Sequence, residues 1–275
     1  MDISLLQDAN GFIKIAAIDH RSSLKKILAE DKLEDFKGLC TENFAPFVTA
    51  ILVDPEYGDK ARESARQNNV SIILSREQSG YLQNPDGRVT ELYSQFNSHK
   101  LKKMGASAIK LHLYYNADAA NAADQRQVAE KVKMECVAAD IPLLLEPVTY
   151  TVPDSPYHKG DAIMHAINDL RAFADILKLE FPIDVDDETE DMDAAIPYLS
   201  AMTIESKVPW ILLSLGMQFD SYKKALGLSK DAGCNGFAVG RAVWQEIDRL
   251  STWPSVEDFI KTTATDRMRQ LAELF

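Results

Sequence analysis

The chain has 275 residues, of which 46% are hydrophobic and 26% charged, so it has enough apolar material for a large core and is not a disordered protein. Its formal net charge of −12 argues against a nucleic-acid or anionic-membrane partner, because phosphates are bound by basic surfaces. The three cysteines, Cys40, Cys136 and Cys234, are far apart and odd in number, which argues against a disulfide framework or a paired-cysteine metal site.

The N-terminal segment 1–12 lacks a basic stretch followed by a long apolar one, and no uncharged apolar run is long enough to cross a membrane. We therefore expect a cytoplasmic protein with no membrane partner. The composition leaves a homo-oligomer open.

Short apolar runs typical of buried strands alternate with longer helix-patterned segments along the whole chain. The predicted strands cover residues 12–20, 50–56, 70–77, 108–115, 142–148, 176–182, 209–214 and 236–241. The predicted helices cover residues 34–46, 59–68, 91–104, 121–139, 161–173, 189–205, 218–232 and 255–273. This even alternation predicts one (β/α)8 barrel domain over residues 1–275. A doubly wound open sheet is the structural alternative.

The first predicted strand ends in polar residues, at the edge of a barrel where active sites are built. Asp19 can accept a hydrogen bond from a lysine or a substrate hydroxyl, and the Arg21 guanidinium can bind an oxyanion; His20 stands between them. The same residue types also cap helices and bridge loops. Asp54 and Glu56, at the end of the second strand, are expected to play a supporting part.

The fourth predicted strand carries Lys110, which alternates with His112 and Tyr114 on one face. An inward lysine can hold a substrate oxyanion, and its charge disfavours protonation of a second amine nearby. The alternative is a structural ion pair with an acid of a neighbouring strand.

The fifth predicted strand is an apolar run that ends in Glu146. A buried carboxyl group at this place can shuttle protons as a general acid and base. The alternative is a salt bridge to Lys110 or Lys178 without proton transfer.

The sixth predicted strand places Lys178 and Glu180 on the same face, with leucines on the other. Desolvation of an inward amine disfavours its charged form and exposes the lone pair that attacks a ketone. The alternative is a lysine that pairs with Glu180 or extends its head to solvent.

The last two predicted strands end in small and cationic residues, in the loops where barrels often bind phosphate. These residues are Ser214, Leu215, Gly216, Gly240 and Arg241. Glycines let the backbone approach an anion closely, the hydroxyl can donate a hydrogen bond, and the guanidinium adds charge. Together they predict an anion site.

The histidines give no metal-ligand set, since only His20 and His112 of the five lie on predicted strands and no HxxH or HxH motif occurs. This opposes a metal-dependent enzyme in which Zn²⁺ would stabilise a carbanion. We expect neither a metal nor a cofactor.

Several segments, in order and at barrel spacing, resemble the class I tagatose-1,6-bisphosphate aldolases and the related sulfofructose-phosphate aldolases. They read AIDHRSSLKKIL, LVDPEYG, AIKLHLYYN, LLLEPVTY, LKLEFPID, PWILLSLG and GFAVGRAVW. The resemblance implies that Lys178 forms the Schiff base and Glu146 is the acid and base, with Lys110 and Asp19 beside them. It also implies that an anionic end of the substrate is bound by Ser214, the backbone around Leu215 and Gly216, and the Gly240–Arg241 pair.

Two residues depart from the family pattern: His20 stands where the family has Gln, and Leu215 where it has a small residue. The first adds a titratable group, and the second can narrow the pocket. Neither change removes a catalytic group.

The resemblance implies an aldehyde-lyase that cleaves a ketose bisphosphate, such as tagatose 1,6-bisphosphate, into dihydroxyacetone phosphate and an aldehyde phosphate. A sulfofructose-phosphate aldolase that releases sulfolactaldehyde is the alternative within the family. Outside it stand a non-catalytic barrel that senses phosphosugars and a barrel isomerase or decarboxylase.

Overall fold

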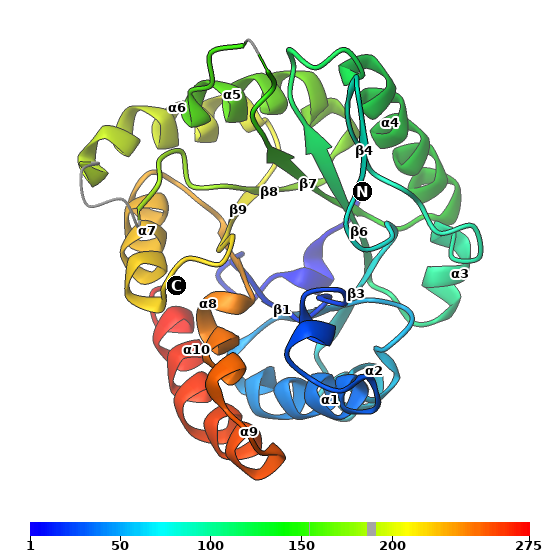
Figure 1. Cartoon of the computed structure of the whole chain (residues 1–275), viewed down its shortest axis with the longest axis vertical. Helices are drawn as coiled ribbons and strands as arrows, with labels where there is room; N and C mark the ends of the chain where they lie inside the picture. Colours follow the sequence, from blue (N-terminus) through cyan, green and yellow to red (C-terminus); the bar gives the residue numbers. More distant parts are fainter. Residues whose placement is uncertain (154, 186–190) are drawn as a thin grey trace.

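Eight parallel strands close into a barrel in the computed structural model, which describes residues 1–153, 155–185 and 191–275 (Figure 1). Around the barrel the strands follow the order β1-β10-β9-β8-β7-β6-β3-β2. Their bounds are β1 Ile13–Ala17, β2 Ala50–Val53, β3 Ser71–Ser75, β6 Ala108–Tyr115, β7 Leu143–Thr149, β8 Ile176–Leu179, β9 Trp210–Leu213 and β10 Gly236–Val239. The closed ring confirms the predicted (β/α)8 barrel and excludes the open sheet.

Helices surround the strands on the outside of this ring (Figure 1). They are α1 Leu33–Phe44, α2 Asp59–Gln67, α3 Ser98–Lys103, α4 Ala122–Ala139, α5 Lys159–Leu170, α6 Ile196–Ser206, α7 Phe219–Asp231, α8 Arg241–Trp244, α9 Trp253–Phe259 and α10 Thr265–Ala272. A π-helical turn joins α9 to α10. Within the described ranges, no helix has both the length and the apolar character needed to cross a bilayer. The first two residues of the helix predicted over 189–205 lie outside the described residues.

The prediction was wrong between the third and fourth barrel strands. A hairpin of β4 (Leu82–Asn84) and β5 (Gly87–Val89) replaces part of the expected connection, and α3 begins at Ser98 rather than at residue 91. The segment before α3 pairs its backbone with the chain beyond β3: Gln78 N donates to Glu91 O at 2.8 Å and Tyr93 N to Arg76 O at 3.3 Å. Because these groups are committed to that pairing, the segment cannot form a helix.

The lower interior of the barrel is filled by an apolar layer of inward-facing side chains. Its members are Ile13, Ile15, Ala17, Ala50, Leu52, Ile73, Ala108, Leu144, Ile176, Ile211 and Ala238, with Leu6 below them. All are at most 3% exposed, so water is excluded from this layer. Because side chains alternate along a strand, the residue two positions after each of these also points inward and lies nearer the mouth of the barrel.

Candidate active site

A cavity of about 370 Å³ opens at the carboxyl ends of the barrel strands. It is lined by every residue that the sequence predicted for the site: Asp19, His20, Arg21, Lys110, Glu146, Lys178, Ser214, Leu215, Gly216, Gly240 and Arg241. The strand period explains the placement, because Lys110, Glu146 and Lys178 each stand two residues after a member of the apolar layer.

The cavity contains a charged layer, which we define as Asp19, Glu77, Lys110, Glu146 and Lys178. All five residues are less than 10% exposed. Each carboxylate of this layer contacts an ammonium group at 3.0 Å or less. The layer therefore keeps ionised groups inside the barrel by pairing them.

Lys178 and Glu146 form the contact at the centre of the charged layer. The Nζ atom of Lys178, on β8, lies 2.8 Å from Oε1 of Glu146, on β7. Glu180, the alternative partner, directly follows β8 and instead accepts hydrogen bonds from the backbone N and the hydroxyl of Thr149, at 2.7 and 2.9 Å. Of the two pairings considered from the sequence, the lysine makes the one with the predicted acid and base.

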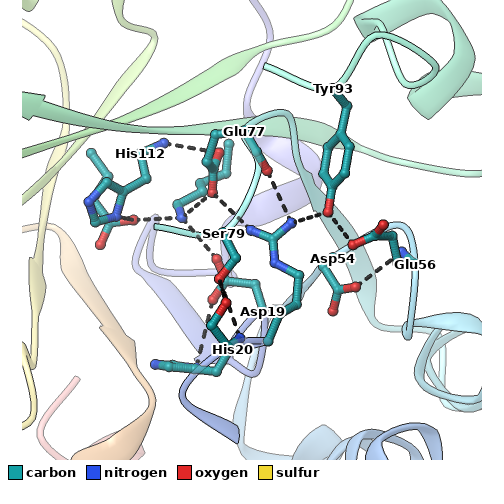
Figure 2. Close-up of polar contacts among 12 residues, drawn as sticks. Asp19, His20, Asp54, Glu56, Glu77, Ser79, Tyr93 and His112 are labelled. Carbon is teal, nitrogen blue, oxygen red and sulfur yellow. Dashed lines mark hydrogen bonds and ion pairs between the residues drawn. The ribbon is translucent and has the colours of Figure 1, made fainter. Parts of the chain in front are cut away.

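Lys110 is enclosed by three carboxylates. Its Nζ atom lies 2.8 Å from Asp19 Oδ2, 2.7 Å from Glu77 Oε1 and 3.0 Å from Glu146 Oε2, and Figure 2 shows Asp19 and Glu77 converging on this point. Burial lowers the pKa of an ammonium group, but the three negative charges outweigh burial and raise the pKa of Lys110 well above its ordinary value. Lys110 is thus a fixed positive charge.

Lys110 and Lys178 lower the pKa values of their acidic partners. Burial raises the pKa of a carboxyl group, yet Lys110 and Lys178 together hold the pKa of Glu146 well below its usual range. The same two cations depress the pKa of Asp19, again against burial. Both groups are carboxylates at neutral pH.

His20 lines the cavity as a neutral imidazole. Burial and the nearby Arg241 outweigh the attraction of Asp19 and lower the pKa of His20 to about 3. Its ring packs edge-on against Trp244, with 5.0 Å between the centroids. The titratable group that departs from the family pattern therefore adds no charge to the site at neutral pH.

Arg21 and Glu77 join the charged layer to a supporting network. Arg21 Nη1 donates to Glu77 O at 3.0 Å and to the Tyr93 hydroxyl at 2.7 Å, and this hydroxyl donates to Glu56 (Figure 2). Asp54, beside it, accepts the backbone N–H of Glu56 at 3.0 Å and pairs with the buried Lys37. The expected supporting part of Asp54 and Glu56 matches these contacts.

One rim of the cavity has the composition expected for an anion site. Leu215 and Gly216 have φ angles of 44° and 83°, and a Cβ atom at Gly216 would lie 3.0 Å from the Arg241 guanidinium carbon. At Gly240 a Cβ would lie 2.7 Å from a backbone oxygen and 2.8 Å from the His20 ring. Gly216 is favoured by its left-handed φ angle, and Gly240 by the closeness of the backbone oxygen. Leu215 is 43% exposed, so its side chain lies at the edge of the cavity and does not fill it.

The opposite rim was not predicted from the sequence. Its lining residues are Ser22, Ser23, Lys26, Ser79 and Gly80. The hydroxyls of Ser22 and Ser79 are 2.8 Å apart, and Lys26 makes no ion pair within the described part of the chain. These residues lie in loops and, for Lys26, in a short 3-10 helix, so no strand periodicity marks them in the sequence.

Glu77 was also missed, although a signal existed. It lies two residues beyond the inward-facing Ser75 of β3 and four beyond Ile73 of the apolar layer, so the strand period continues into the loop. The residue was included in a predicted strand but was not recognised as a partner of Lys110.

Comparison with known families gives one match that covers most of the chain. The model described as DeoC/LacD family aldolase matches residues 13–246. A tagatose 1,6-diphosphate aldolase of Staphylococcus haemolyticus is 30% identical and aligns over 96% of this chain and 95% of its own. A tagatose 1,6-diphosphate aldolase 1 of Enterococcus faecalis is 31% identical over 88% of this chain and 82% of its own.

Solved structures share the fold at much lower identity. An archaeal fructose 1,6-bisphosphate aldolase superposes with a TM-score of 0.68 at 17% identity and covers 98% of this chain and 96% of its own. Another archaeal fructose-1,6-bisphosphate aldolase, solved with its catalytic Lys covalently bound to the carbinolamine intermediate, gives a TM-score of 0.66 at 18% identity, with coverages of 98% and 96%. Both comparisons support the barrel architecture.

Proposed function

The chain belongs to the DeoC/LacD family of aldolases, and from this premise we propose that it cleaves a ketose bisphosphate of the tagatose 1,6-bisphosphate type through a Schiff base on Lys178. Membership confirms the resemblance seen in the sequence and makes the protein an aldehyde-lyase. The observation that carries the proposal is the 2.8 Å contact between Lys178 and Glu146 inside the cavity.

The reaction begins when the neutral amine of Lys178 attacks the ketone carbon of the open-chain sugar. Loss of water from the carbinolamine gives a protonated imine, which accepts the electron pair of the breaking carbon–carbon bond. Glu146, in contact with the amine, is placed to exchange protons with the nitrogen and to take the proton of the C4 hydroxyl, whose O–H electron pair then forms the carbonyl of the released aldehyde. Cleavage leaves an enamine, and protonation of its carbon regenerates the imine. Hydrolysis of this imine releases dihydroxyacetone phosphate and restores the lysine.

The fixed charge of Lys110 gives the charged layer a second use. Its ammonium is held by Asp19, Glu77 and Glu146, so it keeps these three side chains in place during the reaction. Electrostatic groups that do not need to reorient during the reaction contribute most to catalysis. We therefore assign a catalytic role to Lys110 and Asp19 of the charged layer, as the sequence predicted.

The two rims fit a substrate with an anion at each end. Ser214, Gly216, Gly240 and Arg241 supply hydrogen-bond donors and a positive charge on one side, and Lys26 with its neighbouring serines supplies them on the other. Arg21 is less available for this task because its Nη1 is already bound to Glu77 and Tyr93. The named activity of the bacterial relatives supports a phosphate at both ends.

A cleavage assay over a panel of sugars tests this function. The panel contains tagatose and fructose bisphosphates, sulfofructose phosphate and the corresponding monophosphates, each with and without EDTA. We expect bisphosphate cleavage that EDTA leaves unchanged. Inhibition by EDTA would overturn the metal-free mechanism, and faster cleavage of sulfofructose phosphate would transfer the assignment to that substrate.

Two variants test the rims within the same assay. Arg241→Ala and Lys26→Ala each remove a charged hydrogen bond of about 1.5–3 kcal/mol, which raises KM for the bisphosphate by roughly 10- to 100-fold. Lys26→Ala should leave KM for a sugar with one phosphate unchanged. Lys224→Ala, at an exposed position of α7, is the control. Equal KM values for Lys26→Ala and the control would show that the second rim does not bind the substrate.

The cytoplasm remains our proposed location, because a doubly charged sugar does not cross a bilayer unaided. A phosphosugar-sensing barrel is distinguished by the same assay, since it would bind the bisphosphate without cleaving it. An isomerase or decarboxylase would convert the sugar without producing an aldehyde and a ketone.

A further inference from the structure

Asp19 and Glu77 are the two members of the charged layer that do not stand on a barrel strand. β1 ends at Ala17 and β3 at Ser75, so each carboxylate lies two residues beyond the end of its strand. The pairing of β3 with β6 ends where Ser75 lies opposite Lys110. Because chain segments beyond a strand are freer than the strand itself, other contacts must fix these two acids.

Arg21 connects the two segments that carry these acids. It follows Asp19 by two residues, and its Nη1 atom donates to the backbone oxygen of Glu77 at 3.0 Å. Its Nη2 atom lies 3.8 Å from Glu77 Oε1. The ammonium of Lys110 lies between the two carboxylates, 2.7 Å from Glu77 and 2.8 Å from Asp19. The guanidinium therefore helps to set the position of Glu77 relative to Asp19 and Lys110.

The position of the guanidinium depends in turn on Tyr93. Nη1 of Arg21 also donates to the Tyr93 hydroxyl at 2.7 Å, whereas Nε is buried and has no hydrogen-bond partner within the described ranges. The hydroxyl donates to Glu56, three residues beyond β2 (Figure 2). Burial and Glu56 raise the pKa of Tyr93, so the hydroxyl keeps the proton that it donates. One phenol thus links Arg21 to the segment that follows β2.

Tyr93 is itself fixed on several sides. It is 5% exposed, and its ring packs edge-on against Phe96 with 5.3 Å between the centroids. Its backbone N donates to Arg76 O at 3.3 Å, and its backbone O accepts a hydrogen bond from Arg76 Nη1 at 2.6 Å. Tyr93 does not line the cavity, so it supports the charged layer from behind without contacting a bound substrate.

We propose that Tyr93 is a positioning residue for the aldolase reaction: through Arg21 it holds Glu77 against Lys110 and so fixes the geometry of the charged layer. This assignment rests on the proposed aldolase function. Small displacements of reacting or charged groups lower the rate of the chemical step. The hydroxyl therefore acts on kcat and not on KM, because the residues of the two rims keep their places.

Tyr93→Phe removes the hydroxyl alone, since the ring that packs against Phe96 and lies 5.5 Å from the Arg21 guanidinium is kept. The kcat for tagatose 1,6-bisphosphate should fall by about 10- to 100-fold, because a displacement of about 1 Å can cost about 100-fold. KM should stay within about threefold of the unmodified protein. Rates are expressed per site that borohydride and dihydroxyacetone phosphate label on Lys178, so that unfolded protein does not lower them. Tyr198→Phe, which removes a hydrogen bond from a tyrosine to a carboxylate at the surface, is the matched control.

Arg21→Met tests whether the hydroxyl acts through the guanidinium. It removes the contacts with both Tyr93 and Glu77, so kcat per labelled site should fall in this variant as well. Adding Tyr93→Phe to Arg21→Met should lower kcat by less than about threefold further, because the effects of residues in one chain of contacts do not add. If the two losses multiply instead, Tyr93 acts by another route and the assignment is wrong.

Two further results would overturn the role of Tyr93 alone. One is a kcat per labelled site within about threefold of Tyr198→Phe, which would show, even if fewer sites are labelled, that Tyr93 supports only the fold. The other is a raised KM at unchanged kcat, which would place its effect on binding. Failure of the unmodified protein to be labelled at Lys178 is a different result. It would overturn the Schiff-base function and, with it, the assignment that rests on it.

Discussion

The apolar layer and the charged layer lie one above the other in the same barrel, and two residues along a strand separate them. Leu144 is followed by Glu146 on β7, and Ile176 by Lys178 on β8. Both layers are almost fully buried, but the lower one is held by packing and the upper one by ion pairs. The comparison teaches that strand alternation decides where the side chains point, and residue type alone decides whether a layer supports the fold or the reaction.

The two layers should respond differently to mutation. Loss of one member of the charged layer leaves a buried charge without its partner, which affects stability and activity together. Loss of a member of the apolar layer leaves a cavity, which affects stability but does not move the reacting groups. The following predictions test this difference, from the largest expected effect to the smallest.

Lys110→Met should give the largest effect. It removes the ammonium that pairs with three buried carboxylates, and breaking such a pair costs about 3–5 kcal/mol in free energy of unfolding. Cleavage should be lost as well. Urea unfolding and the cleavage assay measure the two quantities.

The double variant Lys110→Met with Glu77→Gln is the control for charge. It removes one of the unpaired carboxylates, so it should recover part of the stability but none of the activity. A single variant that is as stable as the unmodified protein would contradict the role given to the charged layer.

Leu144→Ala, in the layer below, should separate stability from activity. The leucine is fully buried, and its truncation costs about 2–5 kcal/mol. The value of kcat measured well below the melting temperature should change by less than about threefold, because the charged layer keeps its contacts. A loss of kcat as large as that of Lys110→Met would show that the layers do not act separately.

The pH dependence of stability provides a smaller effect. Glu146 and Asp19 have pKa values depressed below their ordinary values in the folded protein. The stability that they contribute is therefore present above the ordinary carboxyl range, about pH 4, and is lost as the pH falls through the folded pKa values. Urea unfolding between pH 7 and pH 3 should show this loss.

Asp19→Asn serves as the comparison for that titration. Without one of the depressed carboxyl groups, the variant should lose less stability between pH 5 and pH 3 than the unmodified protein. Parallel curves for the two proteins would contradict the stated pairing of Asp19.

His20→Gln should give the smallest effect. His20 is neutral because its pKa is lowered to about 3, so a neutral amide keeps the charge of the site unchanged. We expect kcat within about threefold of the unmodified protein and an unchanged pH profile above pH 5. A shift of the profile in this variant would show that the imidazole is charged during the reaction.

Much of the architecture could be predicted because the barrel strands repeat one pattern. Each of the eight runs predicted as strands overlaps an observed barrel strand; the fourth matches β6 over 108–115, and the fifth stops one residue short of the end of β7. The β4–β5 hairpin and the late start of α3 could not be predicted. Tyr93, which reads as part of a helical segment, is held by Arg21 and Glu56, and both contacts come from distant parts of the chain.

The candidate site also contains residues that could be predicted from the sequence and residues that could not. Lys110, Glu146 and Lys178 could be predicted because the strand period points them inward. Lys26 could not, since it lies on a short 3-10 helix outside the strand pattern. The partners of each lysine also depend on register between strands, so the enclosure of Lys110 by three carboxylates could be stated only from the structure.

The central claim is that Lys178 forms the covalent bond with the substrate. The most direct measurement is borohydride reduction in the presence of dihydroxyacetone phosphate, followed by proteolysis and mass spectrometry of the labelled peptide. We predict a single adduct on Lys178, absent from Lys178→Met and unchanged in Lys224→Met. An adduct on another lysine, or none while the carbon chain is still cleaved, would contradict the account.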